Sequence, residues 1–299
     1  MSRILKFMGY VVLALLALIG VALIAVYQVS AAKLRQKHTV TAKVPPILTD
    51  AAAVERGRHI ALTRGCLDCH GKDLGGAKVI EDPAMGRLYG PNLTTGRGGR
   101  SSEYADVDWV RAIRHGIAKD GHTLVLMPSV EYAHFTEDDL ASLIAFLKSV
   151  PAVDRDRVPV KLGPVARVLL VAGKFKLAAD EIDPATLQPA VVKPGATVDY
   201  GRYLAIGCVG CHGSNFSGGK IEIGPPDWPP AANLTPHESG RLAKWTQADF
   251  FRAMRTARRP DGTEISPIMP RNFGQMNDEE LSAIWLFLKT LPAAKTGVR

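Results

Sequence analysis

The chain has 299 residues, and its 37 Lys and Arg against 29 Asp and Glu give a formal charge of +8. This length suits two domains, and 46% hydrophobic with 22% charged residues excludes a disordered chain. Four cysteines are too few for a disulfide-stapled scaffold. Residues 1–37 hold five of the basic residues and no acid, so the rest carries only +3. Such a nearly balanced body indicates no nucleic-acid partner.

The N-terminal segment, residues 1–37, contains an uncharged run of 21 residues from 7 to 27. At about 1.5 Å per residue, a helix of this length spans a hydrocarbon core of about 30 Å. The run is either a retained transmembrane anchor or a cleaved secretory signal, with Val29-Ser30-Ala31 as the cleavage site. It is longer than a signal's usual apolar region, which favours the anchor, and it lacks the polar face of a globular helix. Under either interpretation, the chain is exported from the cytoplasm.

The rest of the chain repeats once, at an offset of 141 or 142 residues. Because solenoid units are only about 20–50 residues long, this offset indicates a duplicated domain. We expect domains at 38–151 and 198–299 and a linker at 152–197, with one short helix within 165–179. The matching pairs of segments are 66–71 with 208–213, 92–94 with 233–235, 109–114 with 250–255, and 126–128 with 268–270.

Each copy is expected to be mostly helical and to end in an amphipathic helix, with apolar residues at i, i+3, i+4 and i+7. Thr136 and Asn277 are the predicted N-caps, because acidic residues that suit the positive helix end follow them. Pro151 and Pro292 are expected to stop these helices.

A second helix is predicted before each cysteine pair, at about 53–64 and 198–206. Gly57 and Gly201 lie in these helices. Either their bare backbone lets the terminal helix approach closely, or they only mark helix starts.

The chemistry lies in two Cys-x-x-Cys-His motifs, a signature of c-type haem attachment. Two thiols add across the two vinyl groups of haem, and the next residue, His, becomes the proximal iron ligand. The residues predicted to hold two covalently bound haem c groups are Cys66, Cys69 and His70 in the first copy and Cys208, Cys211 and His212 in the second. The alternatives are a redox dithiol, a tight disulfide or one zinc site that uses both pairs. Neither motif has the α/β setting of a dithiol enzyme, and zinc does not require a His after each pair.

Met127 and Met269 are the predicted sixth ligands, because each lies 57 residues after the motif histidine and directly before a proline. His122 is the competitor in the first copy, whereas Met276 ranks below Met269 because it has no repeat partner. A carbonyl from Gly90-Pro91 is expected to orient His70, and Ala232 stands at the aligned place for His212. The other histidines that lack repeat partners are expected at the surface or in loops: His38, His59, His115, His134 and His237.

With these residues in place, the chain resembles the dihaem and multihaem cytochrome c proteins of bacterial membranes. It looks most like the cytochrome subunit of periplasmic alcohol, aldehyde and gluconate dehydrogenases, which usually carries three haems where this chain has two motifs. The stretches that carry the likeness are 233–236, 245–255, 261–262, 268–270 and 278–281. The resemblance implies an all-α fold, with two tandem class-I-like cytochrome c domains after an N-terminal transmembrane helix.

The predicted function is electron transfer by an exported dihaem c-type cytochrome, between a dehydrogenase or quinol side and a terminal acceptor. Its expected partners are redox proteins (a dehydrogenase, a cytochrome or an oxidase) and the membrane. We expect a single pass through the bacterial inner membrane with the haem domains in the periplasm, or a soluble periplasmic protein if the leader is cleaved. The chain is not expected to be an enzyme. The rival hypothesis is a dihaem peroxidase, which needs one open iron site, and the two matching methionines speak against it.

Overall fold

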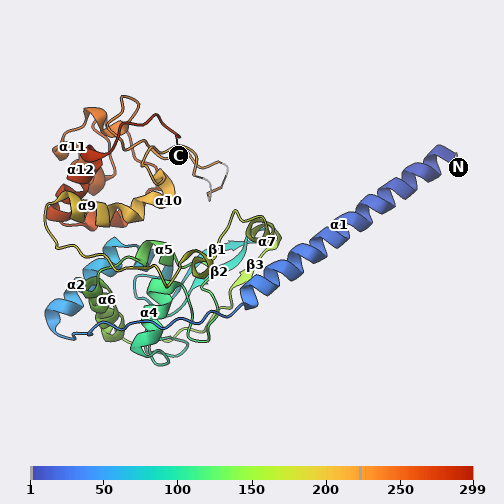
Figure 1. Cartoon of the computed structure of the whole chain (residues 1–299), viewed down its shortest axis with the longest axis horizontal. Coiled ribbons are helices and arrows are strands. Elements are labelled where there is room, and N and C mark those ends of the chain that lie inside the picture. Colours follow the sequence, from blue (N-terminus) through green and yellow to red (C-terminus); the bar gives the residue numbers. More distant parts are fainter. Residues whose placement is uncertain (1–2, 222–223, 226, 299) are drawn as a thin grey trace.

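A computed structural model describes residues 3–221, 224–225 and 227–298 of the chain. It begins with one long helix, α1 (Arg3–Arg35), which projects from a helical body (Figure 1). This helix is long and apolar enough to cross a membrane, and none of its most apolar window is buried inside the protein. The run predicted as an anchor or signal is therefore one continuous helix that stands clear of the body.

The body has two halves, which Figure 1 shows in blue to green and in yellow to red. The first half contains α2 (Ala51–Thr63), α3 (Cys66–His70), β1 (Ala77–Asp82), β2 (Gly86–Gly90), α4 (Asp106–His115), α5 (Ser129–Tyr132) and α6 (Glu137–Ser149). The connecting segment contains β3 (Lys161–Leu162), α7 (Pro164–Val171) and α8 (Ala178–Glu181). The second half contains α9 (Val198–Leu204), η1 (Ala205–Cys208), α10 (Val209–His212), η2 (Arg241–Lys244), α11 (Gln247–Thr256), η3 (Arg271–Gln275) and α12 (Asp278–Thr290).

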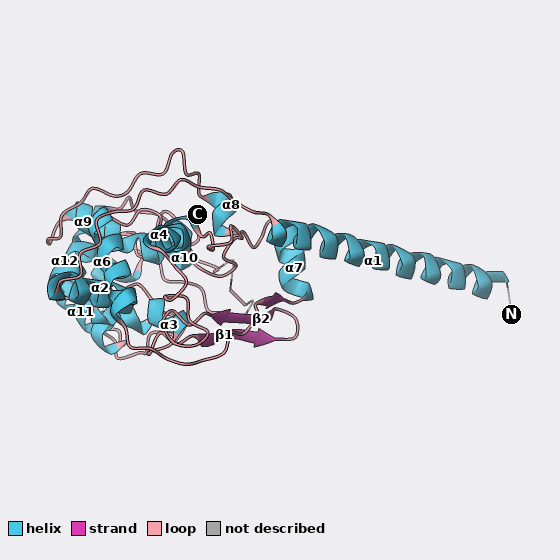
Figure 2. Ribbon diagram, turned by 90° about the horizontal axis from the view of Figure 1, so that it is seen from below, coloured by secondary structure: helices cyan, strands magenta, loops and turns pink. Residues whose placement is uncertain are grey.

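Three short strands accompany the helices of the expected all-α body. They form an antiparallel sheet in the order β1-β2-β3, beside α7 in Figure 2. The turn after β1 is closed by Asp82, whose carboxylate accepts the backbone N–H groups of Ala84 and Met85 at 2.8 Å. Gly86 then takes a φ of +106°, a conformation that favours glycine. The sheet escaped prediction because β3 comes from the connecting segment, far along the chain from β2.

The terminal helices, α6 and α12, confirm their predicted caps. The Thr136 hydroxyl accepts the backbone N–H of Asp139 at 3.0 Å, and the Asn277 side chain accepts that of Glu280 at 2.9 Å. Both helices end two residues before a proline, at Ser149 and Thr290. Local capping chemistry therefore decides where these helices begin and end.

The connecting segment differs from the single short helix predicted within 165–179. It forms α7 and α8, with α7 ending at Val171 and α8 starting at Ala178. Gly173 breaks the run with a φ of +70°. This left-handed turn ends the helix that the apolar pattern alone would have continued.

Gly57 and Gly201 lie where α2 meets α6 and where α9 meets α12. A Cβ on Gly57 would lie 1.9 Å from the carbonyl oxygen of Ser142, and one on Gly201 would lie 1.9 Å from that of Ala283. Neither backbone position leaves room for a methyl group. The prediction of close helix approach is therefore confirmed in both copies.

The two halves contact each other through a pair of related polar interactions. His59 Nε2 lies 2.8 and 3.0 Å from the carboxylate oxygens of Glu280, and the Tyr203 hydroxyl donates to the carboxylate of Asp139. His59 and Tyr203 each lie two residues after the close-approach glycine, and each carboxylate is the third residue of its terminal helix. The expected surface position of His59 is therefore wrong, because this residue joins the halves.

Around these contacts, buried apolar side chains from both halves form one continuous cluster that includes Leu140, Ile144, Leu281 and Ile284. Burial of this shared cluster holds the two copies together as one body.

We expect a His59→Gln variant to lose stability mainly at low pH. The hydrogen bond that protonated His59 donates to Glu280 raises the pKa of His59. The contribution of this bond is therefore complete below the ordinary pKa near 6.5 and is lost as pH rises through the folded value. The loss should be about 1 kcal/mol, since solvent partly screens the pair. Thermal unfolding of the wild type and of His59→Gln at pH 5.5 and pH 8 measures this loss of stability. An equal difference at both pH values contradicts the role, and Arg58→Gln, from an exposed pair with Glu55, is the control.

Candidate haem-binding site

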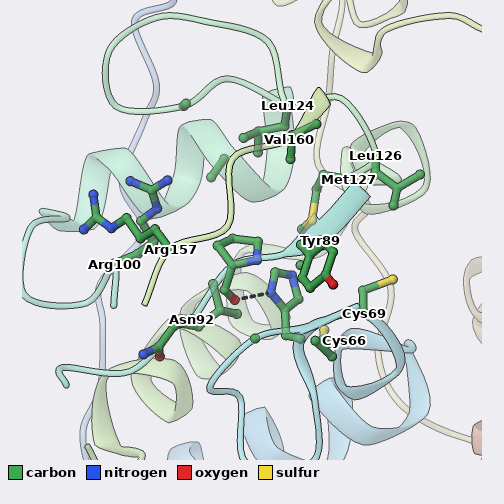
Figure 3. A pocket seen from close by; sticks show the side chains of 18 of the residues that line it. Cys66, Cys69, Tyr89, Asn92, Arg100, Leu124, Leu126, Met127, Arg157 and Val160 are labelled. Atoms are coloured by element: carbon green, nitrogen blue, oxygen red, sulfur yellow. Dashed lines mark hydrogen bonds between the residues drawn. The ribbon is translucent and has the colours of Figure 1, made fainter. Parts of the chain in front are cut away.

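The first half encloses a cavity of about 1130 Å³ that collects the predicted site residues of that copy. Cys66, Cys69, His70 and Met127 all line it. In Figure 3 the two cysteines lie on one side of this cavity, and the Met127 side chain enters from a different wall. The volume lies slightly above the usual range for small-molecule and cofactor sites, about 300–1,000 Å³.

Each motif histidine is buried and oriented by a backbone carbonyl. The Nδ1–H of His70 donates to the Pro91 carbonyl at 2.9 Å, and that of His212 donates to Ala232 at 2.7 Å. Both carbonyls are the predicted ones. Because a carbonyl only accepts, Nδ1 carries the proton and Nε2 keeps its lone pair. Burial also lowers the pKa of His70, so the ring is neutral, which is the form that binds iron.

The repeated Asn-Leu-Thr segment supports this arrangement, a role that the sequence analysis missed. The Asn92 amide donates to the Val153 carbonyl at 2.6 Å, while its oxygen accepts the Thr94 backbone N–H at 2.8 Å. Asn233 makes the equivalent bonds to Ala294 and Thr235, at 2.7 and 2.8 Å. The loop that presents the carbonyl is thereby fastened to the chain after the terminal helix. The repetition of this segment was the available signal.

The environment of the cysteines does not resemble that of reactive thiolates. Burial raises the pKa of Cys66 to about 12 and that of Cys208 to about 12, whereas reactive thiols have lowered values. Within the described parts of the chain, no three His, Cys, Asp or Glu side chains cluster as a metal site would require. The zinc and dithiol alternatives therefore gain no support from the geometry.

The structure separates the methionine candidates. Met127 is half-buried on the cavity wall, whereas Met276 is a core residue with 1% of its surface exposed. His122 is turned toward Asp120, with Nδ1 3.1 Å from the carboxylate, and is not among the lining residues. Met269 is half-buried in the loop before η3. Its pairing with His212 stays a prediction based on the equal offset.

The sequence model of the family described as cytochrome c matches residues 54–151 and again residues 198–292, which together exceed half of the chain. The chain belongs to the cytochrome c family. It is thus an electron-transfer cytochrome, and the family supports haem c as its cofactor.

Similar curated cytochromes include subunits of dehydrogenases. The chain is 27% identical to the fructose dehydrogenase cytochrome subunit of Gluconobacter japonicus, over 84% of this chain and 55% of the relative. It is 26% identical to the gluconate 2-dehydrogenase cytochrome c subunit of Pantoea cypripedii, over 81% and 60%. A diheme cytochrome c-type protein of Cereibacter sphaeroides is 28% identical, over 80% and 86%. The chain therefore spans little more than half the length of the first two relatives.

The lining of the first cavity suits the charge of haem c. Figure 3 places Arg100 and Arg157 on the side away from Cys66 and Cys69. A group attached at the cysteines would direct its carboxylates toward these cations. Trp109, which also lines the cavity, is 2% exposed, and its indole N–H has no hydrogen-bond partner within the described protein. A buried donor without a partner is expected where a cofactor completes the site.

Part of this cavity wall was not predicted, because residues 155–160 of the connecting segment line it. Arg157 is held there by Glu103 at 2.5 Å and by the Gly99 carbonyl at 3.0 Å. The connecting segment was expected only to be a linker between the domains. No repeat partner exists for Arg157, so the comparison of the two copies carried no signal for it.

His115 also departs from expectation, since it is buried at the end of α4. Burial, together with Arg114 and Arg111, lowers the pKa of His115 to about 4, so its ring is neutral. It is not among the cavity-lining residues, so we assign it to packing.

Proposed function

We propose that the chain is an exported dihaem cytochrome c that carries electrons between redox proteins at the bacterial inner membrane. The observation that carries the proposal is the duplicated Cys-x-x-Cys-His motif, in which each buried histidine is held by a backbone carbonyl. The proposed covalent attachment residues are Cys66, Cys69, Cys208 and Cys211. The proposed iron ligands are His70 with Met127 and His212 with Met269.

The chain's own residues would hold and insulate the cofactor. The Pro91 and Ala232 carbonyls fix the two rings with Nε2 available for iron, and Arg100 and Arg157 would neutralise carboxylates in the first site. Haem c, when bound, would supply a one-electron iron couple, and ligation by Met127 and Met269 would raise its potential. Because no residue is proposed to act on a bound substrate, we propose a carrier or a subunit rather than an enzyme.

Contacts between the halves support electron transfer from one proposed haem to the other. Glu131, four residues after Met127, reaches the second motif, since a Cβ on Gly210 would lie 3.2 Å from its carboxylate. Arg64, two residues before Cys66, donates to the Leu204 carbonyl at 2.7 Å. Each proposed haem site thus lies next to residues of the other half, which supports our proposal that electrons pass between the two haems.

The proposed partner class comes from the relatives. Two of them are named as cytochrome subunits of fructose and gluconate dehydrogenases, so we propose a dehydrogenase as the electron donor. A terminal acceptor, such as another cytochrome or an oxidase, would then take up the electron. We further propose domains at 38–151 and 198–299 in the periplasm, with α1 retained as a single-pass anchor.

A covalent haem count on the full-length protein, produced with the c-type maturation machinery, tests the proposal. We expect two haems per chain by mass spectrometry, and one haem in a Cys66→Ser/Cys69→Ser or a Cys208→Ser/Cys211→Ser variant. The reduced protein should pass electrons to a soluble cytochrome without turning over peroxide. A wild-type count below two contradicts the dihaem assignment, and sustained peroxide turnover would favour the peroxidase hypothesis.

A further inference from the structure

Helix α7 (Pro164–Val171) is apolar on almost every side, although it lies at the surface. Its sequence PVARVLLV contains one polar residue, Arg167. The inner face is buried, with Ala166 and Leu170 exposed by only 1% and 3%. The outer face leaves Val165 and Val168 exposed by 44% and 45%. A surface helix normally carries polar residues on its outer face, so this face indicates an apolar neighbour.

The single polar residue of α7 is used to fix this helix to the end of α1. One guanidinium nitrogen of Arg167 donates to the hydroxyl of Ser30 at 2.8 Å, and the group lies 4.3 Å from the centre of the Tyr27 ring. Ser30 is fully buried by this contact region, and Leu34 packs against the same apolar cluster as Leu170. Helix α7 is therefore attached to the stretch of α1 from residue 27 to residue 34.

That stretch of α1 coincides with the expected membrane surface. The apolar run ends at Tyr27, since the polar Gln28 follows, and a tyrosine at the end of such a run is typical of the boundary between membrane and water. Figures 1 and 2 both place α7 beside the body end of α1, and in Figure 2 it runs across the direction of α1. A helix that crosses a membrane-spanning helix at this level lies along the bilayer surface.

The charges around α7 suit a phospholipid surface. Lys161 precedes it and Lys174 follows it, and both are exposed. Lys33 lies at the same end of α1. Of the nearby acids, Glu181 is paired with Lys176 at 3.0 Å, and Asp180 is 3.7 Å from His38. The lysines on both sides of the apolar face would meet lipid phosphates while the valines enter the acyl boundary.

We propose that α7 is a second membrane contact, which inserts Val165 and Val168 into the outer boundary of the bilayer that α1 crosses. The partner is the phospholipid bilayer itself. This inference rests on the proposed anchoring role of α1. Two contacts, one spanning and one lying flat, would fix how the haem domains face the membrane, whereas a single helix would leave them free to turn.

Spin labels on the full-length, haem-loaded protein in nanodiscs of phosphatidylcholine and phosphatidylglycerol test this proposal. The labels are placed by Val168→Cys, by Val191→Cys on a fully exposed valine of the connecting segment, and by Leu16→Cys within α1. The relaxation of each label is measured once with apolar oxygen and once with a water-soluble nickel chelate. We expect the oxygen-to-nickel ratio at position 168 to exceed that at position 191 severalfold, and position 16 to give the highest ratio.

The three positions separate the possible failures. If position 16 is in lipid but position 168 behaves like position 191, the proposal for α7 is overturned while the anchor stands. If position 16 is reached by nickel, the anchor assignment fails, and the proposal for α7 fails with it.

Discussion

Replacing Met127 or Met269 by leucine is expected to remove sixth-ligand chemistry from one haem and leave the other intact. Both haems should stay covalently attached, because the cysteines and histidines are unchanged. The sulfur-to-iron band of the oxidised protein should fall to about half with either variant, and to zero in the double variant, if one methionine serves each iron. The potential of the affected haem should drop by about 0.1 V or more, since axial ligand identity spans about 0.8 V.

Met276→Leu is the matched control for this experiment. Met276 lies seven residues after Met269 but is buried in the apolar core, where leucine conserves volume at a cost below about 1.5 kcal/mol. The band and both potentials should be unchanged in this variant. Loss of the band in Met276→Leu, or its full retention in Met269→Leu, would show that the equal 57-residue offset does not identify the second ligand.

The parts of the fold that could be predicted rest on signals local in sequence. Thr136 and Asn277 start their helices through bonds to residues three positions away, so the capping pattern was sufficient. The sheet was missed because β2 must find β3 across about seventy residues. The contact of His59 with Glu280 joins positions 221 residues apart, and no local sequence pattern predicts this contact.

The residues of the candidate site also fall into those that could be predicted from sequence and those that could not. The motif histidines and their carbonyl partners were predictable, because both belong to the duplicated pattern and the comparison of copies aligned Pro91 with Ala232. Arg157 and the wall around it were not, because they come from the connecting segment, which occurs once. Duplication therefore predicts what the two sites share, and the three-dimensional structure is needed for what distinguishes them.

The other large effect is expected at the two glycines where helices cross. In Gly57→Ala the new methyl would lie 1.9 Å from the carbonyl oxygen of Ser142, and in Gly201→Ala equally close to that of Ala283. Both obstacles are helix backbone, which cannot rotate away as a flexible side chain can. Overpacking usually costs about 1–3 kcal/mol, and a backbone clash should reach about 3 kcal/mol or more.

That loss is large compared with a total stability of about 5–15 kcal/mol. For a body of this size, a loss of about 3 kcal/mol corresponds to a fall in Tm of about 6–12 °C. Far-ultraviolet circular dichroism recorded during heating measures this fall. Gly207→Ala is the matched control, since its Cβ would meet the Phe273 ring at 3.7 Å, an ordinary contact. We expect its Tm to stay within about 2 °C of the wild type, because such substitutions usually change stability by less than about 0.5 kcal/mol.

The pair of glycine variants also tests whether the two halves unfold together. His59 with Glu280 and Tyr203 with Asp139 join helices of opposite halves, around one shared apolar cluster. Gly57→Ala and Gly201→Ala should therefore lower the midpoint temperature of one common unfolding transition by similar amounts. The reason is that damage to either helix contact loosens the same core. Two separate transitions, with each variant moving only its own, would show that the halves fold independently and that the interface contributes little to stability.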